Sequence, residues 1–599
     1  MVGVALFGLI LNGCAAPWQR APGSVAGSVT ERAARLLAGM SLEEKVGQVM
    51  VIAFEGTTVT PAAAQMVRDY HVGGVILFQQ NLQDAAQVRS LTAGLQAQAK
   101  VPLLIGVDQE GGPVIRVTQG VTIFPSEMAI GATFSPDVAG AVAGETAHEL
   151  RDLGINVNFG PVVDVNSNPK NPVIGVRSYG ADPTQVSKLA TAAIATSHQA
   201  GVLAVAKHFP GHGDAEVDSH RELPLIGREL SQLQQTELPP FQAAIAAGVD
   251  GVMTAHVLMP ALEPDPKKSA TLSQPVLTYL REKLGFTGLI VTDDLEMGAI
   301  VNDYGTAEAA KLAFQAGADV LLFRRNVAEQ QKAHGLLVAA VKQGAISQQR
   351  LDQSVRRLLE AKARRGLLDR AAEATRPTAP RSATSTTGTT GDSAKLSDVH
   401  GEALALEVAR RGLTLVKNES GLLPLKLAAG APVCVVYPRP EAVNGVEIGL
   451  PTTGVTGPLS LGEAVKVVYP SAELAAVGLR VSQEESQAAL TCAGRARVVI
   501  AGSYNLNEYP SLAALLRNVV ALGKPAVVVA LRLPYDLGTL EGAPALLATY
   551  SNRPVSLKAA AEAIFGRGPA PAGHLPVPVE PRWVMGYGLV EWGRAETVK

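Results

Sequence analysis

Residues 202–209 read VLAVAKHF, and residues 210–220 continue as PGHGDAEVDSH. The first five residues of this stretch are aliphatic without interruption, which is typical of a strand covered on both faces of a parallel sheet. Pro210, Gly211 and Gly213 exclude a regular helix or a central strand in the segment that follows. The sequence therefore predicts a buried strand that passes directly into a loop carrying many titratable side chains.

The same pattern of short apolar stretches recurs through the first part of the chain, about residues 30–370. Amphipathic segments such as 185–200 separate these stretches, and Ser41 with Glu44 has the spacing of a capping box at a helix start. The eight strand candidates are 49–54, 73–78, 103–108, 155–165, 202–209, 250–256, 288–294 and 319–323. Eight such strands alternating with helices predict a (β/α)8 barrel.

Polar residues gather at the carboxyl ends of these candidate strands. They are Asp108, Asp164, Lys207, His208, His256, Asp293 and Asp294. The carboxyl ends of all strands open onto one face of a (β/α)8 barrel, and the chemistry of such barrels takes place there. We therefore expect these residues to share one site, to which the loop 210–220 also contributes.

The second part of the chain, about residues 397–599, predicts a separate domain. Helical segments such as 510–523 alternate with strand candidates at 413–418, 432–437, 496–504, 526–531 and 545–550. This alternation predicts an open α/β sandwich. No phosphate-binding glycine fingerprint opens any of its helices, so we expect no nucleotide cofactor. Between the two domains, residues 371–396 are rich in Ser, Thr, Pro and Gly, which predicts a flexible linker.

The bulk composition is that of a globular protein with a large aliphatic core. Hydrophobic residues make up 47% of the 599 residues, whereas aromatic residues make up only 4%. A formal net charge of −2 provides no basic surface for nucleic acid, so we expect no nucleic-acid partner. We expect the chain to act as a monomer.

The N-terminal residues 1–16 predict a leader segment. Residues 2–11 form an apolar run that is too short to span a bilayer. The sequence LNGC at 11–14 follows and resembles the end of a bacterial lipoprotein signal, with Cys14 as the lipidated residue. We therefore expect an exported protein anchored to the cell envelope. The alternative is a frayed apolar N-terminus on a cytoplasmic protein.

The two other cysteines, Cys434 and Cys492, lie beside apolar strand-like stretches. We expect both to be buried free thiols, and a disulfide between them is the alternative. No pair of cysteines has the CxxC spacing that zinc sites use.

Four motifs, taken in order, resemble glycoside hydrolase family 3. They are DQEGG (108–112), NPVIGVRSYG (171–180), KHFPGHG followed by DSH (207–220) and VTDDLEMG (291–298). The DSH element is similar to the NagZ-type β-N-acetylglucosaminidase branch of that family. The C-terminal stretches 410–425, 531–537 and 585–589 resemble the α/β sandwich of the two-domain, often lipid-anchored members, so the resemblance covers nearly the whole chain.

The resemblance implies catalytic roles for three residues. Retaining glycosidases need a nucleophilic carboxylate and an acid/base on opposite sides of the sugar. By residue chemistry alone either Asp293 or Asp294 could be the nucleophile, and the family's pattern implies Asp293. Where most retaining enzymes use a second carboxyl group, the NagZ-type branch is similar to an exception with a His–Asp pair, which implies His220 oriented by Asp218. An imidazole with an ordinary pKa near ~6.5 suits proton transfer in both directions at neutral pH.

The resemblance also implies a set of sugar-binding residues. They are Asp108, Arg116, Arg177, Lys207 and His208. Asp164 and His256 match less distinctive positions and are candidates for a supporting shell. The chain departs from the family pattern at Pro113, where the family usually has an arginine after the two glycines. This change puts one basic contact beside the sugar in doubt.

Other interpretations remain open at this point. A loop metal site built from His208 and His212, completed by His220 or Asp214, is one of them, although Pro210 and Gly211 forbid the helix that would align the two histidines. We expect instead no metal and no cofactor, with His212 as a buried hydrogen-bonding residue.

The reaction also has alternatives. A GlcNAc phosphorylase would benefit from a histidine acid/base, because a carboxylate would repel phosphate. A family 3 β-glucosidase would take a carboxylic acid/base from the second domain. A non-catalytic lipoprotein that binds cell wall is the alternative from another class. We expect a retaining β-N-acetylglucosaminidase that acts on GlcNAc-containing saccharides, with GlcNAc–MurNAc cell-wall fragments as substrates.

Overall fold

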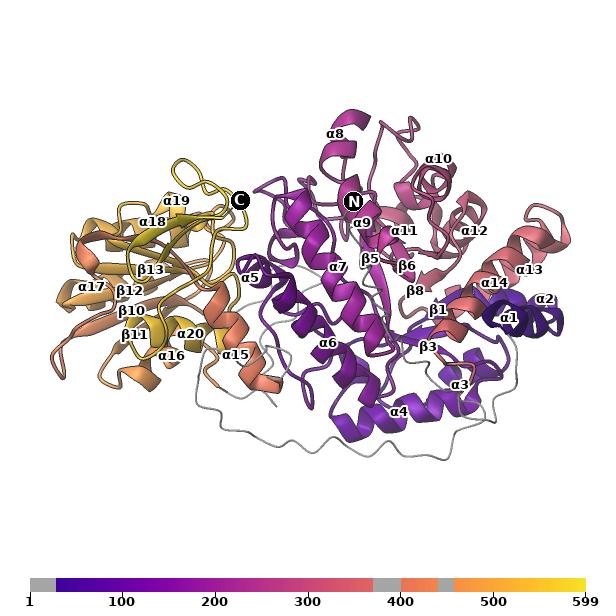
Figure 1. The fold of residues 1–599 in the computed structure, drawn as a ribbon, viewed down its shortest axis with the longest axis horizontal. Coiled ribbons are helices and arrows are strands. Elements are labelled where there is room, and N and C mark those ends of the chain that lie inside the picture. Colours follow the sequence, from indigo (N-terminus) through magenta and orange to yellow (C-terminus); the bar gives the residue numbers. More distant parts are fainter. Residues whose placement is uncertain (1–27, 370–399, 440–456, 599) are drawn as a thin grey trace, which may run out of the picture.

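The computed structural model describes residues 28–369, 400–439 and 457–598. The chain forms two α/β units, and Figure 1 shows the second unit, coloured orange to yellow, beside the barrel. The predictions made for the leader 1–16 with Cys14 and for the linker 371–396 lie outside the described residues. Within the described ranges, no helix combines the length and apolarity needed to cross a membrane.

The first unit is a (β/α)8 barrel, as predicted. Its parallel strands follow the order β7-β6-β5-β4-β3-β2-β1-β8, and a bridge between Val291 and Val320 joins the two ends into a ring. The strands are β1 (Met50–Ile52), β2 (Gly74–Ile76), β3 (Leu104–Val107), β4 (Val157–Asn158), β5 (Leu203–Phe209), β6 (Gly251–Thr254), β7 (Leu289–Val291) and β8 (Leu321–Phe323). The stretch predicted at 155–165 is shortened because Pro161 has no N–H to donate to the sheet.

Helices surround the barrel. Those between consecutive strands are α3 (Pro61–Arg68), α4 (Ala85–Gln98), α6 (Pro136–Asp152), α7 (Pro183–Gln199), α9 (Leu238–Ala246), α10 (Gln274–Thr278) and α12 (Thr306–Ala316). Shorter helices α5 (Glu127–Gly131), α8 (Leu230–Gln235) and α11 (Gly298–Tyr304) lie in the loops. Helices α1 (Val29–Ala38) and α2 (Leu42–Gln48) precede the barrel, and α13 (Val327–Lys342) and α14 (Gln348–Arg364) follow its last strand.

The capping box predicted from Ser41 and Glu44 is present at the start of α2. The Ser41 hydroxyl accepts the N–H of Glu44 at 3.1 Å, and the Glu44 carboxylate accepts the N–H of Ser41 at 2.8 Å. Both donors would otherwise lack a partner at the helix start, so the pair fixes where α2 begins.

The second unit is an open α/β sandwich around a six-stranded sheet of order β11-β10-β12-β13-β14-β9. Its strands are β9 (Thr414–Asn418), β10 (Val433–Pro438), β11 (Glu473–Val477), β12 (Val498–Ser503), β13 (Ala526–Ala530) and β14 (Ala545–Ala548), and a hairpin of β15 (Tyr587–Val590) and β16 (Arg594–Thr597) follows. Strand β9 is antiparallel to its neighbour and the other strands are parallel. The edge strand β11 was missing from the sequence prediction, because its half-exposed residues ELAAV lack the continuous apolar pattern of a covered strand.

Helices cover both faces of this sheet. They are α15 (Gly401–Gly412), α16 (Leu461–Val468), α17 (Gln483–Arg495), α18 (Pro510–Ala521), α19 (Asp536–Thr539) and α20 (Pro554–Ile564). Helices α17 and α18 pack together, as do α16 and α20. Helix α15 packs on α20 and also on α5 and α6 of the barrel, and its Leu404 and Val408 belong to the core cluster of the barrel.

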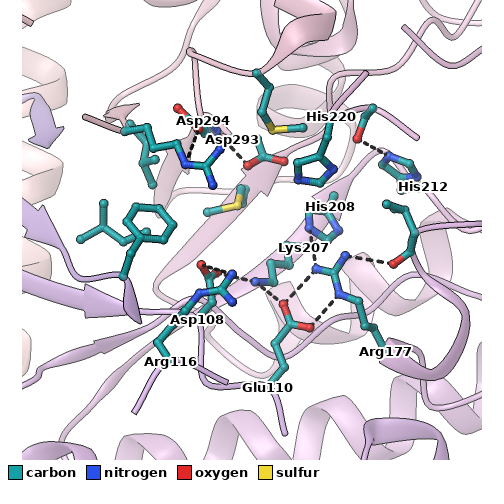
Figure 2. A pocket seen from close by; sticks show the side chains of 18 residues that line it. Asp108, Glu110, Arg116, Arg177, Lys207, His208, His212, His220, Asp293 and Asp294 are labelled. Carbon is teal, nitrogen blue, oxygen red and sulfur yellow. Dashed lines mark hydrogen bonds and ion pairs between the residues drawn. The ribbon is translucent and has the colours of Figure 1, made fainter. Parts of the chain in front are cut away.

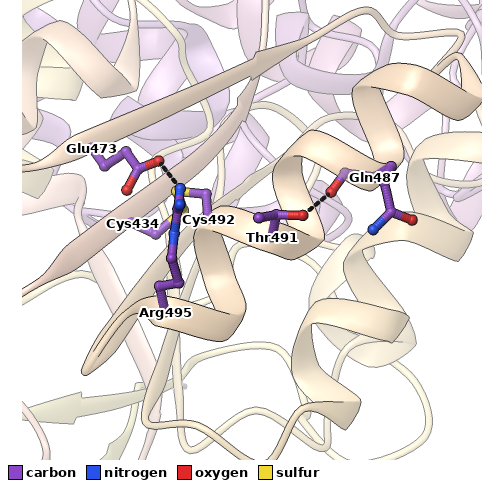
Figure 3. Close-up of a disulfide and its surroundings, with 6 residues drawn as sticks. All are labelled: Cys434, Glu473, Gln487, Thr491, Cys492 and Arg495. Carbon is purple, nitrogen blue, oxygen red and sulfur yellow. Dashed lines mark hydrogen bonds and ion pairs between the residues drawn. A yellow bond between two sulfur atoms is a disulfide. The ribbon is translucent and has the colours of Figure 1, made fainter.

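A disulfide joins Cys434 on β10 to Cys492 on α17 (Figure 3), with the two Cα atoms 5.8 Å apart. The expectation of two free thiols was therefore wrong, and the alternative holds. The two cysteines are 58 residues apart in sequence, and only the packing of α17 against β10 brings their buried side chains together. A crosslink between a strand and its covering helix restricts the unfolded chain and thereby stabilises the sandwich.

The second unit braces loops at the open end of the barrel. The buried Arg553, just before α20, donates from Nε to the carbonyl of Gly112 at 2.6 Å. The hydroxyl of Ser126 donates to the carbonyl of Tyr550 at 2.7 Å. Because Gly112 ends the DQEGG motif, the sandwich holds the backbone of the loop that begins at Asp108, a predicted site residue.

A lysine is buried at the opposite end of the barrel. Lys362 on α14 is fully buried, and its Nζ lies 3.1 Å from Oε1 of Gln48 at the end of α2. Burial lowers the pKa of Lys362 from its ordinary value to about 7. The protonated ammonium is therefore costly to bury, and the folded chain binds this proton more weakly than the unfolded chain does.

We predict that Lys362→Met raises the free energy of unfolding by on the order of 2 kcal/mol at pH 6, since the variant buries no charge. The gain should shrink as the pH rises from about 7 towards about 10, because the folded wild-type chain loses its proton near pH 7 whereas the unfolded chain keeps it until about pH 10. Chemical denaturation at pH 6 and at pH 10 measures both values. Lys332→Met on the exposed face of α13 is the control, and an equal gain at both pH values would contradict the prediction.

Candidate active site

A pocket opens at the carboxyl ends of the barrel strands (Figure 2), and all the side chains that line it come from the barrel. The structure brings most of the predicted site residues together there. Those that line the pocket are Asp108, Arg116, Arg177, Lys207, His208, His220 and Asp293. Three further predicted residues, Asp164, Asp218 and His256, lie directly behind lining residues and hold them in place.

A cluster of buried charges forms one wall of the pocket. The Glu110 carboxylate accepts two hydrogen bonds from the Arg177 guanidinium, at 2.8 and 2.9 Å, and lies 2.6 Å from the Lys207 ammonium. Lys207 also donates to Asp108 at 2.8 Å, and Arg116 lies 3.6 Å from the same carboxylate. Burial by itself raises the pKa of Glu110, but the charges of Arg177 and Lys207 outweigh it and hold that pKa well below its ordinary value.

Glu110 was missing from the predicted site residues, although it is the central anion of this cluster. Its position in the middle of the DQEGG motif was visible in the sequence. Asp108 follows β3 directly, whereas Glu110 lies beyond the strand end in a loop, so the strand-end pattern alone did not single it out.

An irregularity at the end of β5 turns two neighbouring side chains into the pocket. Lys207 pairs with Met253 and Phe209 pairs with Thr254, so His208 is skipped in the register. In a regular strand, consecutive side chains point to opposite faces, whereas a bulge changes the direction of one of them. Lys207 and His208 therefore both line the pocket.

Asp164 fixes the orientation of His208. Its carboxylate lies 2.7 Å from Nδ1 of His208 and accepts the backbone N–H of the same residue at 3.1 Å. It also accepts the backbone N–H of His212 at 2.7 Å. Burial opposes ionisation of Asp164, but the neighbouring His208 outweighs it and lowers the pKa of Asp164. Asp164 is thus a positioning residue that ties the strand end to the loop.

Asp218 and His220 form a pair on the loop after β5. Oδ1 of Asp218 lies 2.7 Å from Nδ1 of His220 and accepts the backbone N–H of His220 at 2.9 Å. Partial burial raises the pKa of Asp218, but these hydrogen bonds with His220 outweigh it and lower that pKa. Because the carboxylate is ionised and can only accept, Nδ1 of His220 carries the proton and Nε2 is left for the pocket.

Asp293 and Asp294 follow β7 and differ sharply in their surroundings. The Asp293 carboxylate accepts the N–H of Asp294 at 2.8 Å. Burial disfavours the charged form of Asp293, but the histidines His256 and His208 outweigh it and lower its pKa. Burial, together with the charge of Asp293, raises the pKa of Asp294 to about 7. Asp293 is therefore the aspartate that is fully ionised at neutral pH, a distinction that residue types alone did not make.

His256 holds the backbone of this turn. Its ring is fully buried, Nε2 lies 2.9 Å from the carbonyl of Asp294, and burial lowers its pKa. The carbonyl can only accept, so Nε2 of His256 donates to it. This hydrogen bond fixes the backbone that carries both aspartates.

His212 is a buried hydrogen-bonding residue, as predicted. Its Nε2 lies 2.9 Å from the Ser219 hydroxyl, and burial lowers its pKa to about 4, so the ring is neutral at pH 7. In the described part of the chain, no three His, Cys, Asp or Glu side chains are grouped so that they could share a metal ion. The histidines of this loop instead hydrogen-bond to protein groups.

The fold and the pocket together define a class of protein. Paired cations and carboxylates on one wall suit the hydroxyl groups of a sugar, which both donate and accept hydrogen bonds. An ionised carboxylate, Asp293, and an imidazole, His220, line the same pocket, and the Asp218 carboxylate behind His220 orients its ring. Such groups suit displacement at an anomeric carbon. A (β/α)8 barrel with these groups at its open end belongs to the barrel enzymes that cleave glycosidic bonds.

Comparisons with known proteins identify the family. Residues 41–361 match the family described as "Glycosyl hydrolase family 3 N terminal domain". The chain is 33% identical over 530 residues to "Beta-hexosaminidase A" of Pseudoalteromonas piscicida, covering 83% of this chain and 86% of the relative. It is 33% identical over 398 residues to "Beta-N-acetylglucosaminidase/beta-glucosidase" of Cellulomonas fimi, covering 65% and 67% of the two chains.

A solved structure of a family 3 β-N-acetylglucosaminidase from Paenibacillus sp. str. FPU-7 superposes with a TM-score of 0.81 at 39% identity, covering 90% of this chain and 99% of that one. The chain therefore belongs to glycosyl hydrolase family 3 and is a glycoside hydrolase.

We predict that Glu110→Gln lowers the free energy of unfolding by about 3 kcal/mol, because two buried cations lose the anion that they share. Urea denaturation of the purified chain at pH 7 measures the change. Glu591→Gln, at an exposed position of the C-terminal hairpin loop, is the matched control and should change stability by less than about 0.5 kcal/mol. Equal losses in the two variants would show that the buried cluster contributes no more than a surface ion pair.

Proposed function

We propose that the chain is a retaining exo-β-N-acetylglucosaminidase, which removes a terminal, non-reducing GlcNAc residue. The observation that carries the proposal is that His220 lines the same pocket as the ionised Asp293, with the Asp218 carboxylate 2.7 Å from Nδ1 of its ring. The relatives from Pseudoalteromonas piscicida and Paenibacillus support the choice of sugar, since their names are β-hexosaminidase and β-N-acetylglucosaminidase.

The first step of the proposed reaction forms a covalent intermediate. The Asp293 carboxylate attacks the anomeric carbon while the bond from that carbon to the leaving oxygen breaks. Protonated His220 gives its Nε2 proton to the leaving oxygen, so the departing saccharide leaves as a neutral alcohol. Glycosyl-enzyme and neutral imidazole remain.

The second step reverses the roles. Neutral His220 removes a proton from water, the oxygen of that water attacks the anomeric carbon, and Asp293 leaves as a carboxylate. Asp218 orients the ring in both steps and stabilises the imidazolium, because its carboxylate stays hydrogen-bonded to Nδ1. Two displacements at one carbon retain the β configuration.

The buried charge cluster has the role of holding the sugar. Asp108, Lys207 and Arg177 offer ionised hydrogen-bond partners for hydroxyl groups, and His208 and Arg116 line the same pocket. Charged partners make stronger hydrogen bonds than neutral ones, so they fix the ring in position for Asp293. We propose GlcNAc–MurNAc fragments of bacterial cell wall as the natural substrates.

We predict that His220→Phe lowers kcat on an aryl β-N-acetylglucosaminide with a poor leaving group by about 100- to 10,000-fold, since general acid/base catalysis contributes about that much. Initial rates of the chain starting near residue 28 measure the effect. The control is His148→Phe, at an exposed position of α6, which should leave the rate unchanged. Turnover near wild type in His220→Phe would remove the residue from the mechanism.

The same assay separates the alternative reactions. Preferred turnover of an aryl β-glucoside would keep Asp293 and overturn the proposed sugar and the acid/base role of His220. Formation of a sugar phosphate when inorganic phosphate is added would indicate phosphorolysis, which an imidazole acid/base permits because it adds no anion to repel phosphate. Binding of GlcNAc fragments without any turnover would indicate a cell-wall-binding protein.

We also propose that the chain is exported and that Cys14 is its lipidated residue. The Cys434–Cys492 disulfide supports export, because structural disulfides persist in oxidising compartments and are rare in the cytosol.

We predict that Cys434 and Cys492 are joined by a disulfide in protein taken from the cell envelope. The sample is alkylated at lysis without reductant, and mass spectrometry should then detect one disulfide-linked pair of peptides. The same sample treated with reductant before alkylation is the control and should carry the label on both residues. Alkylation of both residues without reductant would contradict export.

A further inference from the structure

We propose that Arg324 makes the pocket selective for substrates whose leaving group carries a carboxylate. The inference rests on the proposed function and goes further, because it assigns recognition of an acidic leaving group to a named residue. Arg324 was not among the residues that the sequence analysis singled out.

Arg324 belongs to the same pocket as the charge cluster and Asp293. It follows β8 directly, and its guanidinium carbon lies 5.5 Å from the centre of the Phe78 ring. The guanidinium of Arg116 lies 5.8 Å from the centre of the same ring. Phe78 therefore supports two cations on the side of the pocket formed by β8, β2 and β3.

Two cations of the charge cluster, Lys207 and Arg177, have close carboxylate partners. Lys207 lies 2.8 Å from Asp108 and 2.6 Å from Glu110, and Arg177 forms a two-pronged pair with Glu110. Arg324 instead lies 4.0 Å from a carboxylate oxygen of Asp294. At that separation the pair has no hydrogen bond, so the guanidinium keeps its capacity to bind an anion.

The Asp294 carboxylate is also a weak partner for Arg324. It already accepts the N–H of Glu296 at 2.9 Å. Burial raises its pKa to about 7, so near neutral pH part of the population carries no charge there. The positive charge of Arg324 is therefore incompletely balanced within the pocket.

The exposure of Arg324 places it where the leaving group emerges. Its side chain is 35% exposed, whereas the cations that hold the terminal sugar are buried, at 2% for Lys207, 4% for Arg177 and 8% for Arg116. In an enzyme that removes a terminal sugar, that sugar fills the closed part of the pocket and the leaving group extends towards the opening. Among the Lys and Arg side chains of the pocket, Arg324 is thus the most exposed, and we place it on the side of the leaving group.

The backbone beside Arg324 is fixed. The Glu296 carboxylate accepts the N–H groups of Arg325 at 3.2 Å and Asn326 at 3.1 Å, at the start of the sixteen-residue helix α13. A guanidinium on a braced turn loses little freedom when it binds, and its planar fork matches the two oxygens of a carboxylate. A neutral sugar has no anionic group that could pair with the Arg324 guanidinium, whereas a sugar with a lactyl or uronic carboxylate has one.

The test compares two substrates that differ only in charge. One is the disaccharide of GlcNAc linked β-1,4 to N-acetylmuramic acid, and the other is the methyl ester of the same disaccharide. We expect wild type to cleave the acid with a kcat/KM about 10- to 100-fold above that of the ester, as a hydrogen-bonded charge pair gives. In Arg324→Gln this ratio should fall to about one, Arg324→Lys should restore part of it, and added salt should reduce it in wild type.

Arg325→Gln is the matched control, because Arg325 is the next residue, pairs with Glu55 at 3.4 Å and does not line the pocket. It should keep the wild-type ratio.

Equal cleavage of acid and ester by wild type, or an unchanged ratio in Arg324→Gln, would overturn the inference while leaving the proposed function intact. If inorganic phosphate speeds cleavage by wild type but not by Arg324→Gln, the inference would also be overturned, because Arg324 would then bind phosphate. Failure of wild type to cleave an aryl β-N-acetylglucosaminide would overturn the proposed function and the inference with it.

Discussion

On one wall of the pocket, the Glu110 carboxylate meets the Arg177 guanidinium and the Lys207 ammonium at 2.6–2.9 Å, and all three side chains are buried. Isolated charges could not be buried there, because each would lose its hydration without compensation. Glu110 follows β3, Arg177 lies between β4 and β5, and Lys207 lies near the end of β5. One set of ion pairs therefore fixes three neighbouring segments of the barrel opening before any sugar arrives.

The proposed nucleophile Asp293 and the proposed acid/base His220 are held in place by different parts of the structure. Asp293 sits on a short turn after β7, and His256 holds the backbone of that turn through the carbonyl of Asp294. His220 instead sits on a long loop, and its partner Asp218 lies on the same loop. The proposed nucleophile is thus fixed to the barrel, whereas both residues of the proposed acid/base pair belong to one loop.

The barrel and the sandwich could be predicted from the sequence, because most of their strands are short apolar stretches separated by helical segments. Edge strand β11 lacks that pattern, and the partner of Cys434 depends on how α17 packs, so neither followed from local sequence. The choice between Asp293 and Asp294 depends on burial, which residue type does not reveal. Glu110 and Arg324 were not predicted as site residues for a related reason, since their contacts are with residues far away in the sequence.

The contact between Arg553 and the Gly112 carbonyl joins residues 441 positions apart. During synthesis the barrel emerges first, and its strands can pair while the sandwich is still unmade. The loop that carries Asp108 and Glu110 cannot form this hydrogen bond until the segment near residue 553 has folded. A barrel without the folded sandwich therefore lacks one support of the pocket wall that carries the charge cluster, so it differs from the complete enzyme at the site proposed to bind the sugar.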